Sequence, residues 1–290
     1  MLYLAVSLPV PRVWGSLAGP SGEPVGELWW IYHDWSGSAL LTGPDGSPAG
    51  SLADLVSSRR LPGDPFFPLL VKTLHTADRL SVQVHPGARG GVDCKEETWV
   101  VLEAGLGSWI MAGFRRETSR EELTAALGAG SLAGLLRERF VTPGDVVHLP
   151  PGTIHAMGPG STVLEVQSNC DVTYRLYDWD RKGADGRSRR LDIDRGLDAV
   201  DYSPGGGPHF SRTEDCGQGG VPGPSGYSLR PVAGPCEFDL PPCHVLFLTG
   251  GTMAFPGGRS LSGPCCLIAD SAGGKLDMAA GAAGWTTGVK

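Results

Sequence analysis

Polar and hydrophobic residues alternate over many short segments of this chain, which is the period of β-strands that bury one face. The clearest case is residues 80–86, LSVQVHP. Its three aliphatic residues share one face, and Ser81, Gln83 and His85 share the other. Segments 26–32, 67–74, 94–102 and 146–149 are also rich in strand-forming residues. The pattern predicts a β-rich chain in which some strands carry a polar face.

Two places show helical spacing instead. Ser51 is a candidate N-cap for a short helix from Leu52 to about Arg60. The sequence Ser119-Arg120-Glu121-Glu122 is a capping box, and it predicts a helix that ends at a Gly-Ala-Gly break. A second short helix is expected from Ser131 to Phe140. The fold class expected is therefore all-β, with a small helical insertion at about 119–140.

Turn-forming residues divide the chain. It has 290 residues with 44 Gly and 24 Pro, which without a collagen period indicates many turns between short strands. Residues 203–225 are rich in Gly and Pro and lack periodicity. We therefore expect one β domain over 1–202, a linker over 203–226 and a smaller C-terminal β domain over 227–290.

Charge and composition exclude several classes of function. The formal net charge is −7 and no long basic run occurs, so a nucleic-acid partner is not expected. No segment approaches the ~18 apolar residues needed to span a bilayer. The start, MLYLAVSLPVPRVW, lacks a basic region and is expected to form an edge strand, not a signal peptide. Seven cysteines without a CxxC pair argue against a disulfide framework, so the cytoplasm is the expected compartment.

Candidate metal ligands recur on the predicted strands. His85, Glu97 and His155 offer two imidazoles and one carboxylate, a common set for a catalytic metal, and Gln83 is a fourth candidate. Their separations along the chain are long, so antiparallel strands would have to bring them together. Taken singly, each has an ordinary reading as a solvated or structural side chain.

Four ordered motifs carry a family resemblance. LSVQVHP, then CKEETW, then VTPGDVVHLPPGTIHAMG, then VLEVQSNCDVTYRLYDWDR resemble the type I mannose-6-phosphate isomerases in their shorter bacterial form. The resemblance runs in order from about Trp14 to Leu197, whereas the last 85 or so residues match by position only. It implies a cupin, a double-stranded antiparallel jelly roll.

The resemblance also implies roles for single residues. The ligands of one zinc ion per chain would be His85, Glu97 and His155, with Gln83 less secure because some short members differ there. The catalytic group would comprise Arg175, Glu165 and Lys95. Lys72 and Ser81 match positions that contact the substrate phosphate, although Lys72 taken alone reads as a snorkelling side chain.

The implied reaction interconverts mannose 6-phosphate and fructose 6-phosphate through a cis-enediol. Such a protein would act in the cytoplasm, as a monomer or homodimer, on a small sugar phosphate. The resemblance does not decide which residue is the catalytic base. Glu165 is the first candidate and Lys95 is the second. Gly87 and Ala88 follow His85-Pro86 where the family usually has acidic residues, a departure that could open the rim of the pocket.

Three other readings compete with an isomerase. One is a cupin oxygenase that uses iron at the same two histidines and glutamate. Another is a non-catalytic sugar-binding or regulatory cupin, which loss of a ligand residue would favour, and no ligand residue is lost. The last is a β-sandwich with unrelated polar residues, which a match of four ordered motifs disfavours.

Overall fold

A computed structural model describes residues 1–87, 95–182, 186–203, 207–217, 219–221, 224, 226–255 and 259–289. The chain divides into two compact units. One comprises Pro9–Glu27 and Thr73–Phe210, and the other comprises Met1–Leu8, Leu28–Lys72 and Ser211–Lys290. The chain passes from one unit to the other within strands β4 (Pro24–Ile31) and β9 (Leu69–His75). The composition-based boundaries 1–202, 203–226 and 227–290 stay a prediction.

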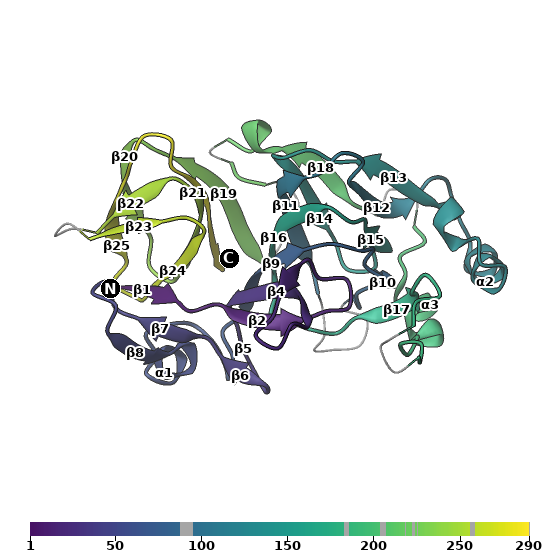
Figure 1. The fold of residues 1–290 in the computed structure, drawn as a ribbon, viewed down its shortest axis with the longest axis horizontal. Helices are drawn as coiled ribbons and strands as arrows, with labels where there is room; N and C mark the ends of the chain where they lie inside the picture. Colours follow the sequence, from purple (N-terminus) through teal and green to yellow (C-terminus); the bar gives the residue numbers. More distant parts are fainter. Residues whose placement is uncertain are drawn as a thin grey trace. The chain divides into compact units, whose positions relative to one another are not determined.

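The unit that includes Thr73–Phe210 is built from two antiparallel sheets (Figure 1). One sheet has the order β13-β12-β15-β10-β17, with bounds Leu136–Phe140, Trp109–Phe114, His155–Met157, Val82–Val84 and Tyr174–Tyr177. The other contains β14 (Asp145–Leu149), β11 (Glu97–Ala104) and β16 (Ser161–Ser168), in that order. It continues through the parts of β9, β4 and β2 (Leu8–Pro11) that belong to this unit, and β3 (Leu17–Ala18) pairs with β4. The predicted all-β class is confirmed.

A hydrophobic core fills the space between these two sheets. Trp99 and Val101 of β11 and Val147 of β14 pack with Ile110 of β12 and Met157 of β15. Because side chains alternate along a strand, the residues between these core positions on β11 and β14 point to the opposite face of their sheet. The alternation predicted for 80–86 is confirmed only in part, because Val82 and Val84 pack on the outer face whereas Leu80 lies in the core between the sheets. Gln83, the one polar residue of β10, faces the interior.

Helices cover the outer face of the β10-containing sheet. Val82, Val84 and Leu176 of that face form a second core with Leu123 and Leu197. The helices that supply the last two are α2 (Arg120–Gly128) and α3 (Ile193–Ala199), and α3 contacts β17 (Figure 1). Ser119 caps α2, as predicted, because its Oγ accepts a hydrogen bond from the Glu122 amide at 3.2 Å.

The second predicted helix of the insertion is wrong beyond Leu135. A 3₁₀ turn covers Leu132–Leu135, and Leu136–Phe140 then forms strand β13. Trp109 of β12 pairs with Phe140, and Met111 pairs with Glu138. The exposed edge of β12 thus takes up the backbone hydrogen bonds of this segment, which overrides its helical spacing. Helix α3 had no predicted counterpart.

The other unit holds the C-terminal strands together with N-terminal ones. Its larger sheet has the order β19-β26-β21-β24-β1-β7-β8, with bounds Tyr227–Ala233, Ala283–Val289, His244–Gly250, Cys265–Ala269, Leu2–Ala5, Leu40–Thr42 and Pro48–Ser51. A smaller sheet has the order β20-β25-β22-β23, with bounds Cys236–Leu240, Gly274–Met278, Thr252–Ala254 and Ser260–Ser262. Leu246, Leu267 and Leu276 lie in the core of these strands.

This unit also contains the hairpin β5 (His33–Asp34) and β6 (Gly37–Ser38), and helix α1 (Leu52–Ser57). Helix α1 is shorter than predicted, and Ser51 caps it with a reciprocal bond to Asp54. Strand β18 (His209–Arg212) and a 3₁₀ turn over Thr213–Asp215 lie where the chain leaves the unit that includes Thr73–Phe210.

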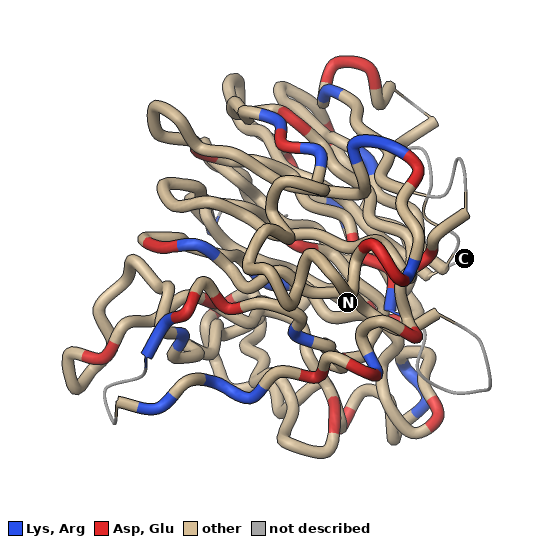
Figure 2. The backbone as a smooth tube through the Cα atoms, turned by 90° about the vertical axis from the view of Figure 1, so that its right-hand side faces the viewer, with Lys and Arg blue, Asp and Glu red and all other residues tan. Residues whose placement is uncertain are grey.

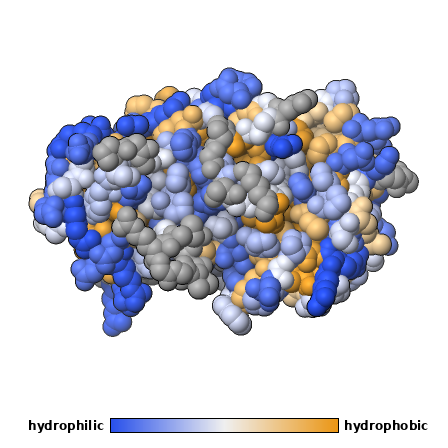
Figure 3. Space-filling view, turned by 180° about the vertical axis from the view of Figure 1, so that it is seen from behind, coloured by the Kyte–Doolittle hydropathy of each residue, from blue (hydrophilic) through white to orange (hydrophobic). Residues whose placement is uncertain are grey.

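Charges of both signs are interspersed along the chain (Figure 2). On the face shown in Figure 3, hydrophilic residues surround smaller hydrophobic areas. No helix among the described residues has the length and apolar character to cross a membrane. The loop between Gly87 and Lys95, where the sequence departs from the family that it resembles, lies outside the described residues.

Candidate metal centre

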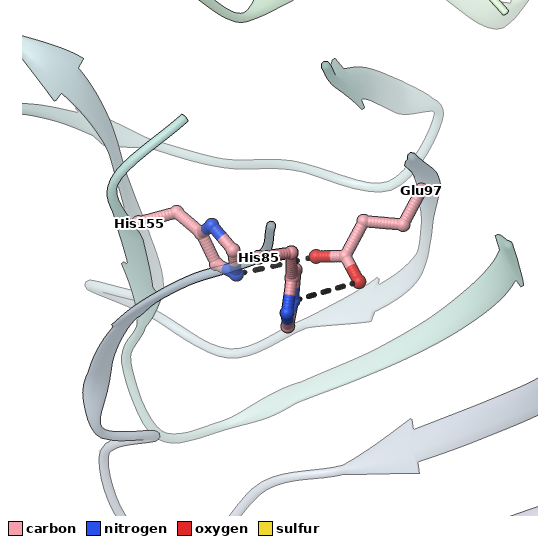
Figure 4. Close-up of side chains that lie close together, drawn as sticks. All are labelled: His85, Glu97 and His155. Carbon is pink, nitrogen blue, oxygen red and sulfur yellow. Dashed lines mark ion pairs between the residues drawn. The ribbon is translucent and has the colours of Figure 1, made fainter. Parts of the chain in front are cut away.

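Three predicted ligands meet inside the unit that includes Thr73–Phe210. Glu97 begins β11, His155 begins β15, and His85 directly follows β10. One ligand atom of each lies within 4.8 Å of those of the other two, and all three side chains are buried. Nε2 of His85 is 3.3 Å from Oε2 of Glu97, and Nε2 of His155 is 3.2 Å from Oε1 (Figure 4).

Backbone carbonyls fix the orientation of both imidazoles. Nδ1 of His85 lies 2.9 Å from the Val172 carbonyl oxygen, and Nδ1 of His155 lies 2.8 Å from that of Thr153. A carbonyl oxygen only accepts, so each Nδ1 must carry the proton. Both Nε2 lone pairs therefore face the Glu97 carboxylate, which is the tautomer that metal-binding histidines adopt.

The electrostatics of the centre keep the ligands in their metal-binding states. Burial lowers the pKa of His85 to about 4, and Lys95 adds to this effect. Burial also lowers the pKa of His155. For Glu97, burial raises the pKa, but opposing positive charge, above all that of Lys95, brings the pKa well below its ordinary value. At neutral pH the centre thus holds two neutral imidazoles and one carboxylate.

The donor set fits a divalent metal ion. Nε2 of His85 and Oε1 of Glu97 are buried and have no hydrogen-bond partner in the described part of the chain. Lone pairs that face one another at 3.2–3.3 Å without a proton between them repel. A cation placed among them would remove this repulsion and satisfy both atoms. The buried His-Glu-His group can therefore hold a metal.

Lys95 and Glu165 lie beside this group. Nζ of Lys95 is 3.1 Å from Oε2 of Glu97 and 3.9 Å from Oε1 of Glu165, and all three side chains are buried. Glu165 lies on β16 opposite Trp99. One ammonium thus neutralises two buried carboxylates in part, which buried charges require.

Arg175 reaches the centre through two polar side chains. Its Nε donates to Oγ of Ser81 at 3.2 Å, and Ser81 donates to Oε1 of Gln83 at 3.1 Å. Nε2 of Gln83 lies 3.3 Å from Nε2 of His155, because Gln83 pairs with His155 on one side and with Arg175 on the other. Turning the Gln83 amide over would present its oxygen to the ligand atoms.

The structure brings eight of the nine predicted site residues into one set of contacts. The ninth, Lys72, is buried on β9 with its ammonium 5.9 Å from the ring centroid of Trp29, a cation–π contact. The carbonyls of Thr153 and Val172 were not predicted. Every residue has a carbonyl, so no side-chain pattern could have revealed which two orient the imidazoles.

Curated proteins with similar sequences share one name. The chain is 35% identical over 208 residues to mannose-6-phosphate isomerase ManA of Bacillus subtilis (strain 168), covering 66% of this chain and 65% of the relative. It is 37% identical over 188 residues to mannose-6-phosphate isomerase of Streptococcus mutans, covering 61% of this chain and 58% of the relative. The chain thus spans less than two thirds of the length of these relatives. No protein-family model matches it.

Solved structures show the same fold. The crystal structure of mannose 6-phosphate isomerase from Bacillus subtilis superposes with a TM-score of 0.81 at 22% identity and covers 99% of each chain. A putative mannosephosphate isomerase from Archaeoglobus fulgidus superposes with a TM-score of 0.75 at 21% identity, covering 100% of this chain and 97% of that one. The predicted cupin-type jelly roll is confirmed.

Proposed function

Since the chain is similar in sequence and in fold to mannose-6-phosphate isomerases, we propose that it belongs to the type I family of these enzymes and interconverts mannose 6-phosphate and fructose 6-phosphate. The single observation that carries the proposal is the buried His85-Glu97-His155 group with Lys95 against its carboxylate. The substrate is a small sugar phosphate, and the expected compartment is the cytoplasm. A monomer or a homodimer is the expected assembly.

The metal we propose is one zinc ion per chain, held by His85, Glu97 and His155. Gln83 is a further candidate ligand because its amide lies against His155. When bound, zinc supplies Lewis-acid chemistry to a sugar oxygen. The Val172 and Thr153 carbonyls accept hydrogen bonds from the Nδ1 atoms of the two histidines, which holds each Nε2 in the orientation needed to bind a metal.

Arg175 is proposed to stabilise the negative charge that develops on the sugar oxygens. Its guanidinium is half-buried, and burial, followed by the nearby charge of Arg189, lowers its pKa. The lowered pKa reflects a site in which an anion would be bound favourably. Ser81 holds the Nε end of this side chain, and the carbonyl of Arg190 accepts from one terminal nitrogen at 3.4 Å.

The proposed base is Glu165, which would take the proton from C2 and return it to C1. A second proton passes between O2 and O1, so the sugar goes through a cis-enediol. Lys95 is the second candidate, since its ammonium lies between Glu97 and Glu165. A Glu165→Gln variant that keeps full turnover would exclude the first assignment. Lys72 and Ser81 stay our proposed phosphate contacts.

A coupled assay tests the function directly. Production of fructose 6-phosphate from mannose 6-phosphate is measured before chelation, after chelation and after zinc is added back. We expect turnover to disappear with the chelator and to return with zinc. Glu97→Gln should lower kcat/KM by at least about a hundredfold because a first ligand is lost, whereas Glu103→Gln, an exposed carboxylate on the same strand, should not. Turnover that survives chelation would contradict a catalytic metal.

Measurements on the same protein preparation distinguish an isomerase from an oxygenase. An enzyme that uses iron at these ligands would consume oxygen and would lose activity when zinc replaces iron. Arg175, Lys95 and Glu165 beside the centre favour chemistry on an anionic sugar, because an oxygenase reaction does not need two cations there. A binding protein without activity would bind mannose 6-phosphate and leave it unchanged.

A further inference from the structure

Gln167 lies beside the metal centre but has no role in the function proposed above. It is on β16, directly opposite Glu97 of β11, and Glu165 is opposite Trp99 in the same register. Side chains of directly paired antiparallel residues share a face, and so do residues two apart on one strand. Gln167, Glu165 and Glu97 therefore share the face that carries the metal ligand.

The orientation of the Gln167 amide is determined by its neighbours. Its Nε2 donates to the carbonyl oxygens of Ser168 at 3.1 Å and of Cys170 at 2.8 Å. An amide turned over would place its oxygen against these two acceptors, so the nitrogen must stay where it is. The amide oxygen Oε1 consequently faces away from both carbonyls.

That oxygen is a buried acceptor without a donor. Gln167 is 0% exposed. Across the residues described, its Oε1 makes no hydrogen bond. Buried acceptors in folded proteins are nearly always paired, and an unpaired one is unfavourable. A donor that arrives with a ligand would satisfy it, as would be expected of a group that recognises that ligand.

We propose that Gln167 is a specificity-determining residue whose Oε1 accepts a hydrogen bond from one hydroxyl of the bound sugar phosphate. The inference rests on the proposed function, which brings a polyhydroxylated ligand to the face shared with Glu97 and Glu165. A neutral amide oxygen suits a neutral hydroxyl donor. A site built to pair with a hydroxyl rejects an analogue that lacks it, because the acceptor then stays buried and unpaired.

Binding of open-chain ligands tests this inference without turnover. The ligands are mannose 6-phosphate reduced at C1, which has no carbonyl and cannot isomerise, and its counterparts deoxygenated singly at C2, C3, C4 or C5. Dissociation constants are measured by calorimetry with the zinc-loaded protein. We expect one deoxy ligand to bind the wild type about tenfold more weakly than the parent, the size of one hydrogen bond with its stranded acceptor.

The variant Gln167→Met keeps the length of the side chain and removes the acceptor. It should bind the parent ligand about tenfold more weakly than the wild type does, and it should no longer distinguish the parent from that deoxy ligand. A purely structural role would weaken all ligands alike and preserve their ratios. Zinc content, measured by mass spectrometry, should stay at one per chain, which shows that the ligand histidines are undisturbed.

Ser161→Ala is the matched control. Ser161 lies on the same strand and face, and its hydroxyl is also buried without a hydrogen-bond partner among the described residues. It is six residues away, roughly 20 Å along the strand, so its removal should leave all ligand ratios unchanged. A wild type that binds every deoxy ligand as tightly as the parent overturns the inference, even if Gln167→Met does not fold.

The two proposals fail in different ways. If the wild type isomerises mannose 6-phosphate but Gln167→Met still distinguishes the same deoxy ligand, the inference falls and the function stands. If the ligand ratios change as expected but no isomerisation occurs, the assignment of Gln167 stands and the isomerase function falls. Absence of any binding by the parent ligand overturns both.

Discussion

Buried imidazoles that stay neutral are the main residue-level feature of this protein. His85 and His155 owe this state to burial, and the same cause lowers the pKa of a third histidine, His148, to about 4. His148 is on β14, opposite Thr98, whose Oγ1 lies 3.0 Å from its Nδ1. Neutral imidazoles can bind a metal without first losing a proton, but they make the fold sensitive to acid.

His148 predicts a stability change with pH. The unfolded chain binds a proton at this histidine below about pH 6.5, and the folded chain resists it down to about pH 4. The stability that the neutral His148 contributes is therefore fully present above pH 6.5, and this contribution is lost as the pH falls from 6.5 to 4. At about 1.4 kcal/mol per pH unit, the loss amounts to roughly 3 kcal/mol.

Urea unfolding from pH 7 to 4, with chelator present, measures this loss. The variant His148→Gln cannot bind the proton, so its free energy of unfolding should fall less over this range than that of the wild type. The comparison isolates His148 because all other histidines are common to both proteins. Parallel pH profiles for the two proteins would mean that His148 binds its proton over the same pH range in the folded chain as in the unfolded chain.

At the scale of elements, the centre depends on strands covered on both faces. Val82 and Val84 pack outward under the helices, which leaves Gln83 to face the interior. Helix α3 packs closely on β17, the strand that carries Arg175. A Cβ added to Gly196 of α3 would lie 2.5 Å from Cδ2 of the buried Leu176. The position of β17 thus depends on a helix residue without a side chain.

Two glycine substitutions separate packing from helix propensity. Gly196→Ala should destabilise the protein by about 1–2 kcal/mol, because the overpacking exceeds the gain in propensity. Gly128→Ala in α2 meets no atom within 4 Å, and it should stabilise by about 0.5–1 kcal/mol. Urea denaturation midpoints measure both. Equal effects of the two substitutions would show that α3 moves away from β17 at no cost.

At the scale of the whole molecule, the chain is two compact units, and the metal centre belongs to the unit that includes Thr73–Phe210. Two of its ligands begin strands β11 and β15 and the third directly follows β10, and these strands belong to two sheets, so only the folded unit brings the three side chains together. A metal that binds the folded unit and not the unfolded chain must stabilise it.

Zinc should therefore raise the stability of the unit that holds the centre. Above the dissociation constant, each tenfold increase in free zinc should add about 1.4 kcal/mol to the free energy of unfolding of the transition that includes this unit. Calorimetry at several buffered zinc concentrations measures the effect. Glu97→Gln should show no dependence on zinc, and Glu103→Gln should show the full dependence. A wild-type transition that does not move with zinc would contradict a metal site at these residues.

The sequence by itself determined the β class, the polar faces of the strands and the residue types of the centre. These follow from alternation and side-chain chemistry, which are local properties of the chain. Lys72 as a phosphate contact and Glu165 as the base stay predictions.

Only the tertiary structure decided which groups orient the ligands and which group is left unpaired. The Val172 and Thr153 carbonyls, the strand at Leu136–Phe140 and the unpaired oxygen of Gln167 all depend on backbone pairing between distant segments. Every residue offers the same backbone groups to such pairing, so the order of side chains does not encode which of them meet.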